Sequence, residues 1–150
     1  AAVIKRIPNA QIEIGPGDDF RTAMQDLHAG DTLVMHGGTY ALSAYFALSL
    51  AGTAQQPITI RAATGEQPLL HFVDASQNIL DIRDSAFLIL DGIEFSGGSR
   101  GIRLMASSDI NAWNWRPSAP AVCRHTSGGP VPADSWYTSA ESPSGVRTRL

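Results

Sequence analysis

The sequence contains a single cysteine, Cys123, so no intrachain disulfide can form. It lacks an excess of positive charge: the formal net charge is −3, which excludes a general affinity for nucleic acid or for anionic membranes. It also lacks any apolar run near the roughly 18 residues that span a membrane. The first residues, Ala-Ala-Val, lack an initial Met, as after removal of a signal peptide or at an arbitrary boundary. Of the two we favour export, to a secreted or periplasmic location.

Catalytic and metal-binding motifs are missing as well. The acidic residues of the middle of the chain match no calcium-binding spacing; they are Asp81, Asp84, Asp91 and Glu94. The glycine-rich run at 97–101 lacks the spacing of a phosphate-binding or dinucleotide-binding loop, so we interpret it as a chain corner. We interpret His28 as a residue of a helix end and His71 as an ordinary outward strand residue. Cys123 has no His–Asn context and is expected to be inert.

The sequence does contain a recurring strand pattern. The runs Leu80–Arg83, Leu88–Phe95 and Ile102–Leu104 alternate apolar and polar residues, which is typical of half-buried strands. Equivalent apolar residues recur after 22 residues, a period that is typical of a coil stacking on copies of itself. The alternative is an antiparallel sandwich of short strands joined by glycine turns.

One helix is predicted, at residues 18–29. Phe20, Met24 and Leu27 have the i, i+4, i+7 spacing of a single apolar stripe. A lone amphipathic helix ahead of a run of strands suits a cap over the first coil, whose apolar interior and strand edges would otherwise be exposed.

The strands after the helix follow the same alternation. We predict that inward apolar residues alternate with outward residues along these strands. The outward positions of the first sheet are Val34, Thr59 and Ile89. The inward set is Leu33, Met35, Ile58, Ile60, Leu70 and Phe72, with a further apolar wall from Phe46, Leu48 and Leu50.

Three stretches carry a resemblance to a known family: PGDDF-RTAMQDLHAGDTLVMHGGTY, GTAQQPITIRAATGEQPLL and NILDIRDSAFLILDGIEFSGGSRGIRL. Together they resemble the N-terminal part of right-handed parallel β-helix proteins of the pectate-lyase-like superfamily, over residues 11–110. The resemblance implies an all-β solenoid: a right-handed parallel β-helix of about four coils with an N-terminal capping α-helix. Members include polysaccharide lyases, epimerases, glycosidases, tailspikes and adhesins.

The last quarter of the chain differs in character. Residues 117–150 are rich in Pro and Ser and lose the alternation, so we divide the chain into a β-helix segment, 1–116, and an irregular tail, 117–150. The tail is either a C-terminal cover or a stretch that is not the native continuation of the β-helix. We expect self-association through the last coil, or a tail that folds back with Trp113 or Trp115 as a plug.

The candidate substrate-binding residues are two arginines and two tryptophans. Arg83 and Arg103 are expected outward and able to bind a sugar carboxylate in bidentate fashion. Trp113 and Trp115 have like-facing strand spacing and can stack on sugar rings or close the end of the prism. The outward charges Asp81, Arg83, Glu94 and Arg103 can equally form a solvated face with cross-strand pairs.

The resulting functional hypothesis is an N-terminal segment of a carbohydrate-active protein. The resemblance implies a polysaccharide lyase acting on acidic polysaccharide by β-elimination, with Ca²⁺ as the cofactor of such lyases. The residues themselves identify no catalytic set and no metal ligands, and we expect the full set on coils beyond these. The alternative is a non-catalytic structural or glycan-binding module of the tailspike or adhesin type.

Overall fold

Short strands dominate the described part of the protein. The computed structural model describes residues 9–74, 76, 78–98, 100–105, 107–113, 116–117, 123–126, 136–137 and 148–149. Within these residues there is one helix, α1 (Phe20–Gln25). No described helix has both the length and the apolar character needed to cross a membrane.

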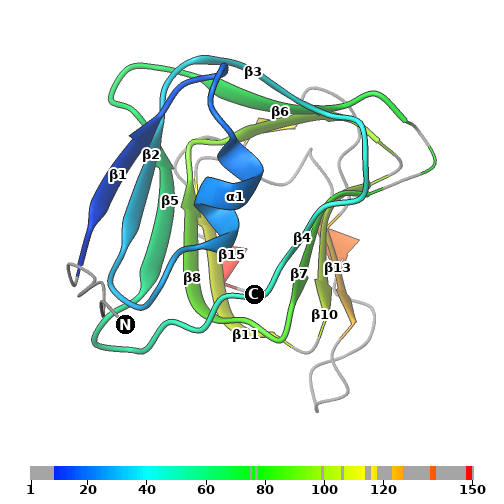
Figure 1. Cartoon of the computed structure of the whole chain (residues 1–150). Helices are drawn as coiled ribbons and strands as arrows, with labels where there is room; N and C mark the ends of the chain where they lie inside the picture. Colours follow the sequence, from blue (N-terminus) through cyan, green and yellow to red (C-terminus); the bar gives the residue numbers. More distant parts are fainter. Residues whose placement is uncertain are drawn as a thin grey trace, which may run out of the picture.

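The strands form three sheets, seen as three walls in Figure 1. In spatial order, sheet I consists of β1 (Gln11–Ile14), β2 (Thr32–Met35), β5 (Ile58–Ala62), β8 (Ala86–Asp91), β11 (Ser108–Trp113) and β15 (Thr148–Arg149). Sheet II consists of β3 (Gly38–Leu42), β6 (Pro68–Phe72), β9 (Glu94–Gly97) and β12 (Arg116–Pro117). Sheet III consists of β4 (Ala47–Leu48), β7 (Asn78–Arg83), β10 (Arg100–Met105), β13 (Cys123–Thr126) and β14 (Trp136–Tyr137).

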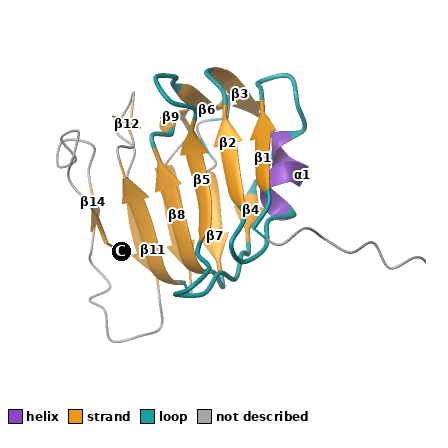
Figure 2. Cartoon of the chain, turned by 90° about the vertical axis from the view of Figure 1, so that its left-hand side faces the viewer, coloured by secondary structure: helices purple, strands orange, loops and turns teal. Residues whose placement is uncertain are grey.

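The predicted fold class is corrected by these sheets. Neighbouring strands are parallel through most of each sheet, as Figure 2 shows for sheet I, but β14 and β15 join their sheets antiparallel. Among the described residues, the sheets also have unequal numbers of strands: six, four and five in sheets I, II and III. The protein is therefore described as several mainly parallel sheets with few helices. The regular right-handed parallel β-helix of about four coils is not the fold that we assign.

Strand register confirms the repeat in the second half of the chain and corrects it in the first. Leu104 pairs with Ile82, as the 22-residue spacing predicts. In sheet I, however, Leu33 pairs with Ile60 instead of Ile58. Val34 consequently lies beside Arg61, two residues away from its predicted neighbour Thr59. The connection between these strands is longer than in the later turns of the chain, so the later period does not give their register.

The core consists of the apolar side chains that point inward from all three sheets. Leu33, Leu48 and Ile82 are completely buried, and Leu70 is 1% exposed. The wall predicted from Phe46, Leu48 and Leu50 is confirmed, because all three side chains are buried. Aromatic residues fill the end near α1. They are Phe20, Tyr40 and Phe46. The Phe20 ring meets the Tyr40 ring edge to face at a centroid distance of 5.4 Å and the Phe46 ring at 6.1 Å.

Helix α1 closes the end of the core that is next to β1, as Figures 1 and 2 show. All three residues of the predicted apolar stripe are buried: Phe20 and Met24 belong to α1, and Leu27 follows its C-terminal end. The helix is shorter than the predicted range 18–29. It starts after Asp19, whose Oδ1 accepts a hydrogen bond from the Thr22 backbone N–H at 3.2 Å and so caps the first turn.

Glycine is required where the chain turns between sheets I and II. Gly92 lies between β8 and β9 with a φ of +73°, in the left-handed region that other residues rarely adopt. A Cβ there would also meet the Ala62 Cβ at 3.1 Å.

The predicted irregular tail contains strand residues where the structure describes it. β13, β14 and β15 all lie between residues 117 and 150. Most other residues of this range lie outside the described part, so the division into 1–116 and 117–150 stays a prediction, as does self-association through this end.

Met24→Asp is expected to destabilise the protein by about 3–5 kcal/mol, because a carboxylate would replace a side chain that is 1% exposed. Gln25→Asp introduces the same residue at an exposed neighbouring position of α1 and should cost much less. Denaturant unfolding of both variants measures the difference. Equal midpoints would contradict the role of α1 as a cover for the core.

Candidate functional site

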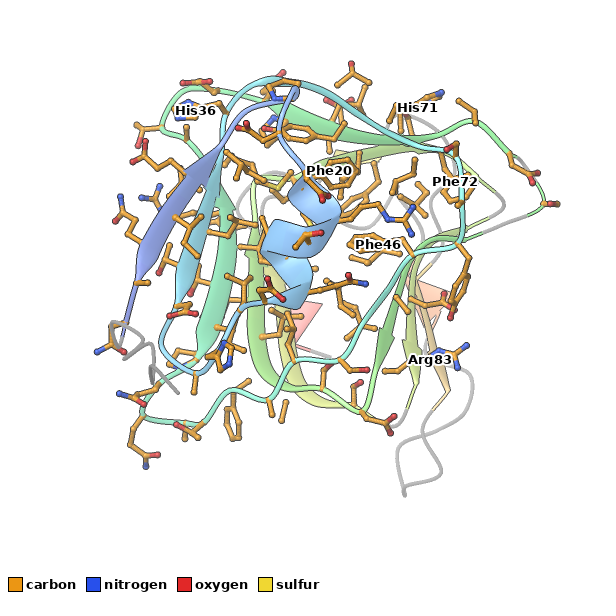
Figure 3. The ribbon with its side chains drawn as sticks, in the orientation of Figure 1. Phe20, His36, Phe46, His71, Phe72 and Arg83 are labelled. Atoms are coloured by element: carbon orange, nitrogen blue, oxygen red, sulfur yellow. The ribbon has the colours of Figure 1, made fainter. Side chains whose placement is uncertain are left out.

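The candidate site is a cluster of three side chains on the outer side of sheet III: Tyr45, Asp81 and Arg83. The Tyr45 hydroxyl donates a hydrogen bond to Asp81 Oδ2 over 2.9 Å. Arg83 Nη2 lies 3.6 Å from the same oxygen, and its guanidinium carbon is 5.7 Å from the centre of the Tyr45 ring. We call this group the Tyr45–Asp81–Arg83 cluster; Figure 3 shows Arg83 on the outer side of the sheet.

The structure corrects the prediction that Asp81 is a solvated outward charge. Asp81 is 1% exposed, although it alternates with the inward residues Leu80 and Ile82 as a strand residue should. The segment just before β4 contributes to its cover, since the Phe46 carbonyl accepts the Asp81 backbone N–H at 3.0 Å and the Tyr45 hydroxyl reaches its carboxylate. A buried carboxylate needs such partners, because its desolvation is costly without them.

Tyr45 and Arg83 are the accessible members of the cluster. Tyr45 is 45% exposed and the Arg83 side chain is 42% exposed. Partial burial, followed by the hydrogen bond to Asp81, raises the pKa of the Tyr45 hydroxyl above its ordinary 10.0, so it is protonated at neutral pH.

Arg83 retains an unused donor. Its Nε is buried and has no hydrogen-bond partner among the described residues. A buried N–H without a partner is unfavourable, and a bound water molecule would satisfy it. A ligand carboxylate would instead meet the exposed part of the Arg83 side chain, which is 42% exposed, while Asp81 lies on the other side of the guanidinium.

Further arginine positions flank the cluster along sheet III. Arg103 in β10 pairs with Asp81 in β7, and Arg124 in β13 pairs with Arg103. Paired residues of parallel strands occupy the same face, so positions 81, 103 and 124 form one row. The prediction that Arg103 lies on a strand is confirmed. The side chains of Arg103 and Arg124 are not among those that the structure describes.

Trp113 belongs to a strand of a different sheet from this cluster. Trp113 ends β11 in sheet I, where it pairs with Asp91. Trp115 lies outside the described residues. The predicted grouping of these tryptophans with Arg83 and Arg103 as one set of substrate-binding residues stays a prediction.

The outward row of sheet I is more polar than predicted. In register, it consists of Glu13, Val34, Arg61, Asp91 and Trp113. Val34 is 4% exposed, which corrects its prediction as an open outward residue. The Arg61 guanidinium donates from Nη1 to the Ala62 carbonyl at 3.3 Å.

A second polar cluster joins β1 to the loop before β6. Glu13 Oε2 lies 3.4 Å from His36 Nε2, and Glu66 Oε1 lies 3.1 Å from His36 Nδ1. Glu66 Oε2 also accepts the Gly37 backbone N–H over 2.6 Å. The hydrogen bond to Glu66, then that to Glu13, raises the pKa of His36 above its ordinary 6.5, because both carboxylates favour the charged imidazolium between them.

His71 has a polar neighbour that its predicted role as an ordinary strand residue did not include. Its Nδ1 lies 2.8 Å from the Ser96 hydroxyl, on paired positions of β6 and β9 in sheet II. Among the described contacts of this pair, no carboxylate orients the imidazole, so the arrangement lacks the third group that usually activates a serine nucleophile.

The described residues do not fit a calcium site. They contain no group of three His, Cys, Asp or Glu side chains that could hold a metal ion. Asp81 already accepts from Tyr45 and lies beside Arg83, an arrangement that suits a cation-binding carboxylate poorly. We therefore derive no step through Ca²⁺.

Comparison with known proteins gives one informative likeness. No family model matches the chain, and no curated protein matches it. The crystal structure of alginate lyase from Paenibacillus sp. str. FPU-7 matches with a TM-score of 0.64 and 22% sequence identity, over 71% of this chain and 36% of that one. At this identity the likeness shows a shared fold. The chain thus has a polysaccharide lyase as a structural neighbour, and it spans about a third of that neighbour's length.

Sequence reasoning identified Arg83 but missed Tyr45 and the burial of Asp81. The segment before β4 has no strand alternation that would place Tyr45 beside a residue 36 positions later. The available signal was the apolar alternation of Phe46, Leu48 and Leu50, which indicates a strand at β4. This alternation does not specify that β4 pairs with β7, nor which way the Tyr45 side chain points.

The His36 contacts predict a pH-dependent stability. Because the folded pKa of His36 is raised above 6.5, the stabilisation is complete below pH 6.5 and is lost as the pH rises through the folded pKa. Glu66, whose pKa is lowered from 4.5 mainly by the Gly37 N–H, adds stability above pH 4.5 that is lost in more acidic solution.

Unfolding free energies of the parent and of His36→Gln, measured from about pH 5 to about pH 9, test this. The advantage of the parent should shrink as the pH rises. His28→Gln is the control, because His28 bonds to the backbone carbonyl of Asp26. A constant difference between parent and His36→Gln would contradict the bridge.

Proposed function

We propose that this chain is part of a carbohydrate-active protein of the polysaccharide-lyase type, and that the outer side of sheet III binds the carboxylates of an acidic polysaccharide. The observation that carries the proposal is the Arg83 side chain, which is 42% exposed next to the exposed ring of Tyr45. The resemblance to the pectate-lyase-like superfamily and the likeness to an alginate lyase support the substrate class.

The reaction that such a site would serve is β-elimination. A base removes the C5 proton of a uronate, the bond from C4 to the glycosidic oxygen breaks, and a C4=C5 double bond forms while an acid protonates the leaving oxygen. The C5 proton is acidic enough only when the neighbouring carboxylate is neutralised. Arg83 is the residue that we assign to this neutralisation; Arg103 lies on the neighbouring strand β10, in the row of Asp81.

The base and the acid are not assigned. Asp81 is buried and shared by Tyr45 and Arg83, and the Tyr45 hydroxyl is protonated at neutral pH, so neither is suited to take a proton from C5. What we assign to this chain is therefore the recognition of the uronate carboxylate.

A second function remains supported by the same observation. A non-catalytic glycan-binding module would need the carboxylate contact of Arg83 and no base. Sheet III offers that contact without an identified base among its described residues, which favours this module as the alternative.

One experiment separates the two functions. The chain is incubated with alginate, pectate and chondroitin, with and without Ca²⁺, and unsaturated uronate is followed by its ultraviolet absorbance while binding is measured by calorimetry. Unsaturated product supports the lyase, and binding without product supports the module. Failure to bind all three polymers would reject both.

Arg83→Gln should weaken binding of the preferred polymer by about tenfold or more, since a charge-assisted hydrogen bond is lost. Arg61→Gln removes the same charge from sheet I and is the matched control. Equal losses in the two variants would show that general charge, and not the Tyr45–Asp81–Arg83 cluster, attracts the polymer.

A further inference from the structure

Tyr45 is unusual among the described residues because it is a large aromatic side chain that is both exposed and held in place. Only Tyr45 and Val73 are exposed large hydrophobic residues in the described part, at 45% and 65%. The Tyr45 hydroxyl is bonded to Asp81, and its carbonyl oxygen accepts a hydrogen bond from Arg21 Nη2 over 2.7 Å. The residue is thus held at both its side chain and its backbone.

The hydrogen bond to the Tyr45 backbone comes from Arg21 of helix α1. Besides its bond to the Tyr45 carbonyl, the Arg21 guanidinium lies over the Phe46 ring, 5.2 Å from its centre. Phe46 is 1% exposed and packs against Phe20 of the same helix. Arg21 therefore ties the helix to the segment that carries Tyr45.

An exposed ring beside a guanidinium suits one chemical class of ligand. A pyranose has an apolar face of C–H groups that packs on an aromatic ring, and a uronate adds a carboxylate for the arginine. The Arg83 guanidinium lies over the Tyr45 ring, with its central carbon 5.7 Å from the ring centre, so a sugar that packs on the rest of the exposed ring would lie close to the guanidinium. A neutral sugar would offer the exposed Arg83 side chain no carboxylate.

We propose that Tyr45 forms the sugar-contacting surface of a uronate subsite with Arg83, and that Arg21 is a positioning residue that holds Tyr45 there from helix α1. This inference rests on the proposed binding of acidic polysaccharide and adds the residues that contact and orient one sugar unit. In this proposal helix α1, which covers the core, also belongs to the binding site.

The sugar contact is tested by calorimetric binding of alginate oligosaccharides to Tyr45→Ala, Tyr45→Phe and Val73→Ala. Tyr45→Ala should weaken binding about three- to tenfold, the range of a lost ring contact. Tyr45→Phe keeps the ring and should lose less. Val73→Ala removes the other exposed apolar side chain and should bind like the parent. Unchanged binding by Tyr45→Ala would overturn the sugar contact.

The positioning role of Arg21 is tested without any ligand. Carbon-13 labelled tyrosine allows the Tyr45 hydroxyl to be titrated by NMR in the parent, in Arg21→Met and in Arg21→Lys. If Arg21 holds Tyr45 against Asp81, Arg21→Met should lower the Tyr45 pKa toward its ordinary value, and Arg21→Lys should restore part of the shift.

Gln25→Met is the matched control for Arg21→Met. Gln25 Nε2 donates to the Ala47 carbonyl over 3.4 Å, so it joins the same helix to the same segment two residues further on. It should leave both the Tyr45 titration and oligosaccharide binding unchanged. Equal effects of Gln25→Met and Arg21→Met would show that Arg21 only attaches the helix and would overturn the positioning role.

The outcomes separate this inference from the proposed function. If the parent binds no acidic polymer, the proposed function and the sugar contact are both wrong, and the titration alone decides whether Arg21 positions Tyr45. If the parent binds and Tyr45→Ala binds equally well, the proposed function stands and the uronate subsite at Tyr45 is wrong.

Discussion

In-register packing of inward apolar side chains is the constraint on which the rest of the structure depends. Leu33 pairs with Ile60, and Ile60 with Leu90, so the same inward position is apolar in three successive strands of sheet I. A slip of one residue would turn a whole set of apolar side chains to the outside. The register that packing selects also decides which residues share an outward row, and the row of Asp81 and Arg103 is one result.

Buried polar groups are tolerated in this core where they have partners. Ser85 lies between sheets III and I, and its hydroxyl accepts the Leu50 N–H at 3.0 Å and donates to the Arg83 carbonyl at 2.8 Å. Ser107, 22 residues later, accepts the Ser85 N–H. Asp81 differs, because its partners include side chains that reach solvent. The burial of this carboxylate is thereby coupled to the accessible Tyr45 and Arg83, and this coupling makes the cluster a site.

The sequence predicted what a repeating local pattern can specify. Alternation identified the inward residues and the strand that carries Arg83, and the 22-residue spacing gave the register of Ile82 with Leu104. It did not give the pairing of Val34 with Arg61, since that pairing crosses an irregular connection. The same pattern led to a regular parallel β-helix, which is wrong, because alternation within strands does not report the antiparallel strands β14 and β15.

The position of Tyr45 follows from how the end of the core is closed. A sheet edge exposes backbone carbonyls and apolar side chains that need a cover. Helix α1 buries Phe20 and Met24 against that end, and its polar residues Arg21 and Gln25 donate to the carbonyls of Tyr45 and Ala47. Of these two donors, Arg21 thus also holds the backbone of Tyr45. A change in helix α1 would therefore affect the Tyr45–Asp81–Arg83 cluster through the hydrogen bond from Arg21 to the Tyr45 carbonyl, without any change in sheet III itself.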